Sequence, residues 1–246
     1  MLLRSITKHV KDQNWFAVAL DFVIVVAGIL IAFQITHWNE ARNNRVQERA
    51  YLERLSSDLA ATKERNSVQV ERNAGLMKTT GITLSSLKSC ALKPEDEASF
   101  VYGLYDLGRY NLPEFVDGTF EELNATGNFQ LIRNLELRRN ITRVYQDVER
   151  INRIDRQVND RIIPKVNYVR RYISFNHAEF KGGPLELDRD AIEMDFEAIC
   201  SDPVFFNSVS SITELMLAVD GLTKSTIIES EDLKAAIDEE LDRLNK

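Results

Sequence analysis

The longest run of apolar residues in the chain covers residues 16–35 and contains one charged side chain, Asp21. Twenty helical residues at about 1.5 Å each span the roughly 30 Å hydrocarbon core of a bilayer. Trp15 and Trp38 bracket the run, and indole side chains favour the depth of the lipid headgroups. The run is longer than the apolar region of a typical cleaved signal peptide. We therefore predict an uncleaved transmembrane helix over residues 15–38, with the lipid bilayer as its surroundings.

One face of this predicted helix carries its acid and its small residues. Five residues follow one another at steps of four, three, four and three, which places them on that face: Asp21, Val25, Gly28, Ala32 and Ile35. Small residues let a second helix approach closely, and a carboxylate inside a membrane indicates a polar contact. Asp21 is also near enough to Trp15 to reach headgroup water instead. The face predicts a helix–helix contact. Asp21 either takes part in that contact or reaches the headgroup water, and the sequence leaves both open.

The orientation of the predicted span depends on its flanks. The basic tail, residues 1–14, carries Arg4, Lys8 and Lys11, and the segment after the span has nearly the same number of Lys and Arg residues. Long domains after a span translocate largely regardless of charge, whereas a short cationic tail is retained. We expect the tail in the cytoplasm and the rest of the chain on the other side of the membrane.

Beyond the span, the apolar spacing is helical almost throughout. Residues 39–93 predict one long helix, which we interpret as a stalk because residues 60–74 are nearly all polar. Residues 94–246 are predicted to complete a helical bundle with it. Within them, apolar residues at alternating steps of three and four predict a long helix from Leu137 to Ile173 and another after Pro203, capped by Ser201 or Asp202. The pattern shows no convincing strand, so the predicted fold is all-α, an elongated up-down bundle.

Short signals fill the region between these long helices. Pro94 and the acids after it favour a helix start, and that helix is expected to run to about Tyr110. In the turn-rich connector that follows, Thr119 and Glu122 have the spacing of a capping box. Gly127 is expected to end this small helix in a left-handed conformation.

The two cysteines are predicted to lie near each other. In an up-down-up-down path, Cys90 follows the first helix of the body and Cys200 precedes the last, so both belong to the end of the bundle farther from the span. An oxidising compartment permits a disulfide between them. The alternative is that both serve as unpaired apolar fillers.

The composition offers little chemistry. A net charge of −7 argues against nucleic acid as a partner. His9, His37 and His177 are far apart in the sequence, and neither a Gly-rich phosphate loop nor a paired-cysteine metal motif is present. We therefore expect no enzyme activity, no catalytic residues, no metal site and no cofactor.

Two segments resemble a known family. The first is Gly28-Ile-Leu-Ile-Ala-Phe-Gln34 with Trp38-Asn-Glu40, Tyr51-Leu52 and Asp58-Leu59, and the second comprises Thr119-Phe-Glu-Glu-Leu123, Thr126-Gly127, Leu131-Ile132, Asn134, Leu137-Arg138 and Tyr145. Over residues 20–60 and 119–146 the chain resembles a bacterial membrane-anchored family that is classed as a domain of unknown function. The resemblance implies a bacterial single-pass membrane protein with a helical domain. Combined with the orientation expected from the flanks, this predicts the inner membrane with the domain in the periplasm. It implies no activity.

Two functions fit these expectations. The first is a non-enzymatic, membrane-anchored helical bundle that assembles with copies of itself or with a membrane-protein partner. The alternative is an extracytoplasmic ligand-sensing bundle. A pocket of convergent polar groups between the long helices would favour sensing, and an exposed apolar stripe that several copies share would favour assembly.

Overall fold

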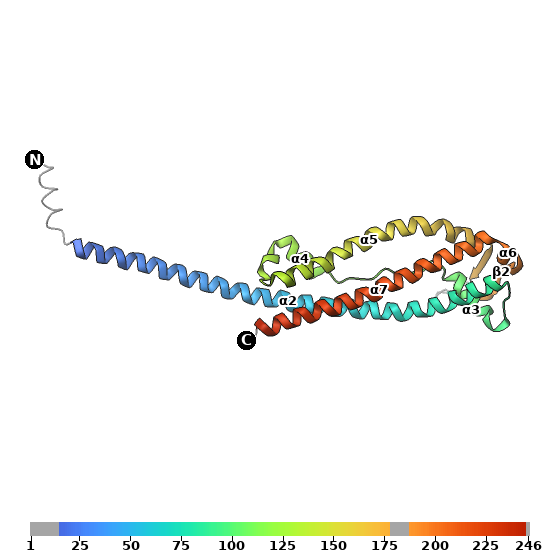
Figure 1. The fold of residues 1–246 in the computed structure, drawn as a ribbon, viewed down its shortest axis with the longest axis horizontal. Helices are drawn as coiled ribbons and strands as arrows, with labels where there is room; N and C mark the ends of the chain where they lie inside the picture. Colours follow the sequence, from blue (N-terminus) through green and yellow to red (C-terminus); the bar gives the residue numbers. More distant parts are fainter. Residues whose placement is uncertain (1–14, 178–186, 245–246) are drawn as a thin grey trace, which may run out of the picture. The chain divides into compact units, whose positions relative to one another are not determined.

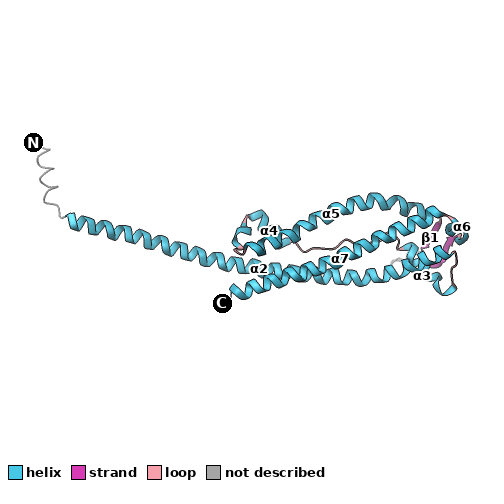
Figure 2. Ribbon diagram, in the orientation of Figure 1, coloured by secondary structure: helices cyan, strands magenta, loops and turns pink. Residues whose placement is uncertain are grey.

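The structure is a computed structural model that describes residues 15–177 and 187–244. The all-α prediction is confirmed, because helices make up most of the described chain (Figure 2). The chain divides into two compact units, Met1–Ala50 and Tyr51–Lys246. Helix α2, Trp15–Ser89, contributes residues to both. The predicted basic tail lies outside the described residues.

In the first unit, helix α2 exposes large apolar side chains all around its axis. They reach from Leu20 to Ile35 and include Phe22, which is 68% exposed. A helix that is apolar on every side, yet uncovered by protein, is typical of a membrane span. Among the described residues, α2 is the one helix that is long and apolar enough to cross a bilayer, and its apolar part lies near the N-terminus.

All the other helices and strands of the described residues belong to the second unit (Figure 1). In chain order these are the short 3-10 helix η1 Pro94–Asp96, α3 Glu97–Tyr105, α4 Gly118–Thr126, the 3-10 helix η2 Asn128–Leu131, α5 Leu135–Arg170, β1 Ile173–His177, β2 Leu187–Met194, α6 Phe196–Ser201 and α7 Pro203–Leu244. Residues 109–117 form an extended connector that returns along the bundle between α3 and α4. The resulting path within this unit is up, down, up and down.

Antiparallel contacts hold α2 against α7. Ser56 donates a 2.7 Å hydrogen bond to Asp238, and Lys63 forms an ion pair with Glu231. Farther along, Asn73 donates to Asp220 at 3.5 Å. Residues later in α2 contact residues earlier in α7, so the two helices run antiparallel. Helix α5 packs against α7 as well, which completes the three-helix frame that the apolar spacing predicted.

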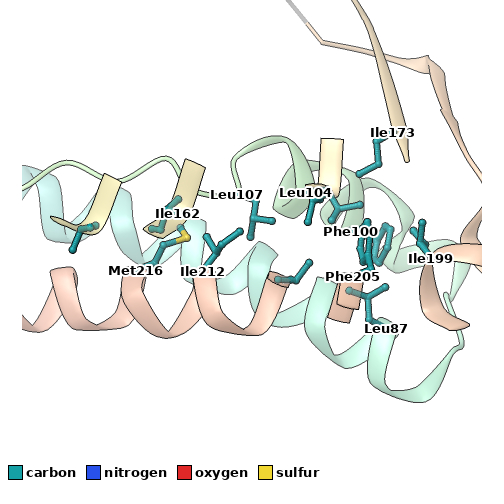
Figure 3. Packing of buried hydrophobic residues seen from close by; sticks show 13 residues of the cluster. Leu87, Phe100, Leu104, Leu107, Ile162, Ile173, Ile199, Phe205, Ile212 and Met216 are labelled. Carbon is teal, nitrogen blue, oxygen red and sulfur yellow. The ribbon is translucent and has the colours of Figure 1, made fainter. Parts of the chain in front are cut away.

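The apolar core consists of two separate clusters. One gathers at the end where the hairpin and α6 lie, with Phe100, Phe205, Leu87 and Ile199 at its centre, and continues along α5 and α7 (Figure 3). The other joins Leu52, Leu55 and Leu59 of α2 to α4, the start of α5 and the end of α7. These buried positions include Leu137, Ile141 and Val144 of α5 and Phe205, Val209 and Ile212 of α7, whose spacing predicted the two helices.

Between the clusters, α2 buries polar side chains within residues 60–74, the polar stretch that suggested a stalk. Thr62, Asn66, Gln69 and Asn73, the polar seam, are all buried at helical spacing. Their partners are mostly backbone groups of the connector: Asn66 donates to the Glu114 carbonyl at 2.7 Å and accepts from the Glu114 amide at 3.0 Å. Gln69 donates to the carbonyl of Asn111. An extended segment without a strand partner needs such hydrogen bonds, which explains the burial.

Two expectations about secondary structure are wrong. Residues 173–177 and 187–194 form an antiparallel hairpin, so the all-α frame contains a small sheet that the pattern did not predict. Helix α3 ends at Tyr105 instead of about Tyr110, since Gly108 adopts a φ of 79° in the turn that follows. A side chain at Gly108 would meet Val166 at 2.8 Å, so this turn also packs tightly against α5.

Candidate interaction site

Residues 51–59 of the first segment of the family resemblance meet the second segment at the end of the second unit where α4 lies. Tyr51 and Arg54, one turn apart on α2, both donate hydrogen bonds to the carboxylate of Glu122 on α4, at 3.1 and 2.5 Å. Asn128 in turn donates to the Tyr51 hydroxyl at 3.0 Å. The Arg54 bond, and then the Tyr51 bond, lower the pKa of Glu122 below its usual value. These contacts fix α4 to α2 across about 70 residues of sequence.

A carboxylate from α2 also caps helix α4. The backbone amide of Thr119 donates to Asp58 at 3.2 Å, and anionic groups are stabilising at a helix N-terminus. Thr119 itself lies inside the helix and is buried, so the predicted capping box of Thr119 and Glu122 is wrong: Glu122 binds α2 instead. The prediction for Gly127 is confirmed, because it ends α4 with a φ of 72°.

The start of α5 is built from the same motif residues. Asn134 caps this helix by accepting from the amides of Glu136 and Leu137 at 3.1 Å, and its side chain donates to Glu240 of α7 at 2.6 Å. Tyr145 stacks on Phe120 of α4 with ring centroids 4.4 Å apart. Burial, and then the nearby carboxylates of Asp58 and Asp117, raise the pKa of Tyr145, which keeps its hydroxyl protonated.

These motif residues therefore support the shape of the unit. Their side chains are largely directed at one another and at backbone groups. Sequence reasoning listed them as two separate segments, and only the fold shows that they form one network.

The outer surface beside this network carries charges of both signs. A polar hollow of about 230 Å³ lies between α5 and α7, lined by Asn134, Glu136, Leu137, Asn140, Ala236, Glu239, Glu240 and Arg243. Next to it, α5 presents a basic surface with Arg139 and Arg143 exposed. Such a surface is suited to recognition of a partner through charge.

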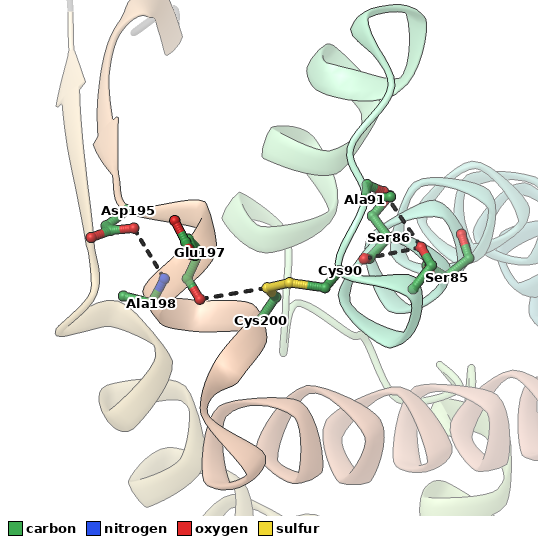
Figure 4. Close-up of a disulfide and its surroundings, with 9 residues drawn as sticks. Ser85, Ser86, Cys90, Ala91, Asp195, Glu197, Ala198 and Cys200 are labelled. Carbon is green, nitrogen blue, oxygen red and sulfur yellow. Dashed lines mark hydrogen bonds between the residues drawn. A yellow bond between two sulfur atoms is a disulfide. The ribbon is translucent and has the colours of Figure 1, made fainter.

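At the opposite end of this unit, the structure brings Cys90 and Cys200 together. The two sulfurs are bonded and the Cα atoms are 5.3 Å apart (Figure 4). Cys90 directly follows α2 with a φ of 46°. Its amide donates to the Leu87 carbonyl, and the Ala91 amide donates to that of Ser86, which is the hydrogen-bond pattern of a helix end usually made by glycine. The bond to Cys200 explains why a cysteine occupies this position.

The predicted transmembrane face lies on the first unit's part of α2. Val25, Gly28, Ala32 and Ile35 are exposed, and a side chain built at Gly28 would have no neighbouring atom within 4 Å. Asp21 belongs to the same helix, Trp15 begins it, and Trp38 is 67% exposed. A single chain does not test the helix–helix contact, which stays a prediction.

The described residues contain no group of three or more His, Cys, Asp or Glu side chains that could hold a metal ion. His37 lies 3.6 Å from Glu40 on the same helix, both largely exposed.

No protein-family model, curated protein or solved structure matches this chain, so the interpretation of the site depends on its own residues.

Proposed function

We propose that this chain is a non-enzymatic, single-pass inner-membrane protein whose helical domain assembles with further copies of itself. Residues 15–38 form the span, the basic tail lies in the cytoplasm, and the unit Tyr51–Lys246 lies in the periplasm. In a variant of this proposal, the span contacts a helix of a different membrane protein instead of the span of a second copy.

The observation that carries the proposal is the exposure of the apolar part of α2. Large apolar side chains from Phe22 to Ile35 are at least one-third exposed, and most are more than half exposed. A contiguous surface of this kind on a soluble protein marks a membrane or protein contact. Its length fits one bilayer crossing.

The disulfide supports the periplasmic location. Disulfides persist in oxidising compartments and are rare in the bacterial cytoplasm. Cys90 and Cys200 are the only cysteines of the chain, and they are bonded to each other. A reporter enzyme fused after Lys246 tests this: alkaline phosphatase should be active there, and activity of a cytoplasmic reporter instead would reverse the orientation.

The mass of the detergent-extracted protein tests assembly. The wild-type chain should give an oligomer, and a triple variant Asp21→Leu, Gly28→Leu and Ala32→Leu should weaken it, because bulky residues prevent close packing of helices. Ala27→Leu is a matched control, since it enlarges a small residue about 100° around the helix from Gly28. A monomeric wild-type chain would reject self-assembly, and an unchanged mass of the triple variant would reject this membrane contact.

Ligand sensing is the second candidate, and the polar hollow between α5 and α7 favours it. Asn140, Glu239 and Arg243 converge there with both hydrogen-bond donors and acceptors. Native mass spectrometry of freshly purified protein tests this use. A small molecule retained by the wild type and lost in Asn140→Leu, which removes the Asn140 amide from the hollow, would support sensing; identical spectra would reject it.

A further inference from the structure

Helices α5 and α7 carry opposite net charges although the whole chain is only moderately acidic. The 36 residues of α5 include nine Lys or Arg and five Asp or Glu, a balance of +4. The 42 residues of α7 include three basic and nine acidic residues, a balance of −6. The two helices lie side by side in the second unit (Figure 1). One surface of the unit therefore combines a basic helix with an acidic one.

The charges that matter are those pointing away from the core. On α5, Leu137 and Ile141 face the apolar cluster, and at 100° per residue Arg139 and Arg143 point outward. On α7, Leu233 and Ile237 face the same cluster, and Asp232 and Glu239 point outward by the same geometry. All four charged residues are exposed. None of the four makes an ion pair with a described residue.

The basic strip of α5 (Arg139 and Arg143) and the acidic strip of α7 (Asp232 and Glu239) lie on the same side of the helix pair. The polar hollow is open between α5 and α7, and Glu239 is one of its lining residues, as are Glu136 and Asn140 of α5. Arg139 and Arg143 each lie three residues beyond one of these two α5 residues, nearly one full turn of helix. The arginines and the acids thus flank one hollow.

The strips also lie at matching heights along the bundle. Asn134 of α5 donates to Glu240 of α7, which fixes the antiparallel register. Arg139 is five residues after Asn134, and the equivalent height on α7 is five residues before Glu240, between Asp232 and Glu239. Arg143 is level with Asp232 to within about one residue by the same argument.

We propose that this surface binds a second copy of the chain through a two-fold axis parallel to α5 and α7. Such an axis preserves height, so Arg139 and Arg143 of one copy meet Asp232 and Glu239 of the other, and the reverse pair forms at the same time. An isologous contact requires this self-complementarity. The inference deepens the proposed self-assembly, on which it rests, by assigning the surface of contact outside the membrane.

A second copy fits this surface better than other anionic partners. A lipid headgroup or a nucleic acid would be attracted to Arg139 and Arg143 but repelled by Asp232 and Glu239 next to them. A copy of the same surface, turned by the two-fold axis, presents each sign where the other is needed. Exposed Leu135, on the same outer part of α5, adds apolar area to the contact.

Charge exchange in the full-length chain, in detergent, tests this contact. One variant carries Arg139→Glu and Arg143→Glu, and a second carries Asp232→Lys and Glu239→Lys. In either variant alone, like charges face each other, so self-association should weaken by about tenfold or more. When the two are mixed with different affinity tags, both sets of contacts become attractive, and the mixed dimer should form to within about threefold of the wild type. A chain with all four exchanges should self-associate again.

A matched control is Arg161→Glu with Lys165→Glu, which has the same spacing on α5 but lies far from the hollow. It should leave association unchanged, and thermal unfolding of every variant checks that the fold is intact. Oligomers that persist in both charge variants would overturn the assigned surface while leaving self-assembly in place. Loss of association in the variants without recovery in the mixture would overturn the reciprocal pairing. Binding of the wild type to anionic vesicles that is lost with the arginines, from a chain that stays monomeric, would assign the surface to lipid instead.

Discussion

Between Phe22 and Ile35, helix α2 exposes phenylalanine, valine, isoleucine and leucine, whereas between Thr62 and Thr83 the same helix buries threonine, asparagine and glutamine. Asn66 is 0% exposed, and Phe22 is 68% exposed. In an ordinary globular helix the relation is the reverse. The difference shows that side-chain polarity alone does not predict burial: the first part is matched to lipid, and the second part is matched to hydrogen-bonding groups of its own chain.

The partners of the second part explain how polar burial is tolerated. Thr62 accepts from the Val116 amide at 2.9 Å, and Thr83 donates to the Phe100 carbonyl at 3.1 Å. Gly103 allows that approach, since a side chain there would come within 2.7 Å of the Thr79 carbonyl oxygen. A buried polar group with a partner costs little, and one without a partner costs much. The second part of α2 should therefore respond strongly to loss of its tertiary contacts, and the first part should not.

The largest effect is expected from removing the disulfide. The bond closes a loop of 110 residues, so Cys90→Ser with Cys200→Ser should lower the free energy of unfolding of the second unit by about 5 kcal/mol by the chain-entropy argument. Chemical denaturation in detergent measures this. Hydrogen exchange should quicken in the last turns of α2, which precede Cys90, and stay unchanged from Phe22 to Ile35. An equal increase in the hydrogen-exchange rate from Phe22 to Ile35 would contradict the expected difference between the two parts of α2.

A smaller effect is expected from Asn66→Leu in the polar seam. The substitution keeps the helix but leaves the amide and the carbonyl of Glu114 without the Asn66 side chain, so unfolding should become easier by about 3 kcal/mol. Gln34→Leu is the matched control on the exposed part of the same helix. It should leave the unfolding of the second unit unchanged, and greater stability of Asn66→Leu would refute the role of the seam.

The sequence predicted much of the frame because its signals are local. Alternating apolar steps identify α5 and α7, and the expected cap of the last helix is found: Asp202 accepts from the Val204 amide at 2.8 Å. The path of these helices also placed Cys90 and Cys200 at one end. Local signals could not show that Asn66 meets Glu114, or that Tyr51 meets Glu122, because those partners depend on how distant segments fold back. The hairpin was missed because β1 has only five residues and β2 carries four charged ones.

A difference of about 1 kcal/mol is expected at the end of α2. With Cys200→Ser in both proteins, Cys90→Gly should be more stable than Cys90→Ser by this amount, because the φ of 46° is costly for any residue with a Cβ. The same exchange one residue earlier, Ser89→Gly, lies in the right-handed helix and should have the opposite sign. Thermal unfolding of the set gives both signs, and a less stable Cys90→Gly would mean that the left-handed conformation depends on the disulfide.

The smallest effect concerns the pH dependence of the contact between α2 and α4. The hydrogen bonds from Arg54 and Tyr51 lower the folded-state pKa of Glu122 below the ordinary value of 4.5. A carboxyl group with a lowered pKa contributes stability above its unfolded-state pKa and loses that contribution as the pH falls through the folded-state value. Glu122→Gln should therefore be less stable than the wild type at neutral pH, and the two should converge in acid. The margin is small because the pair is solvent-exposed.

Glu121→Gln provides the comparison for that measurement, since Glu121 is the exposed neighbour on α4 and has no ion-pair partner among the described residues. Its unfolding midpoint should follow that of the wild type from neutral pH down to about pH 3, the range over which the Glu122→Gln difference should disappear. Salt should shrink the Glu122→Gln difference as well, because exposed charge pairs are screened. A difference that grew in acid would mean that Glu122 holds α4 through its protonated form, and the charge pairing with Arg54 would then not be what joins α4 to α2.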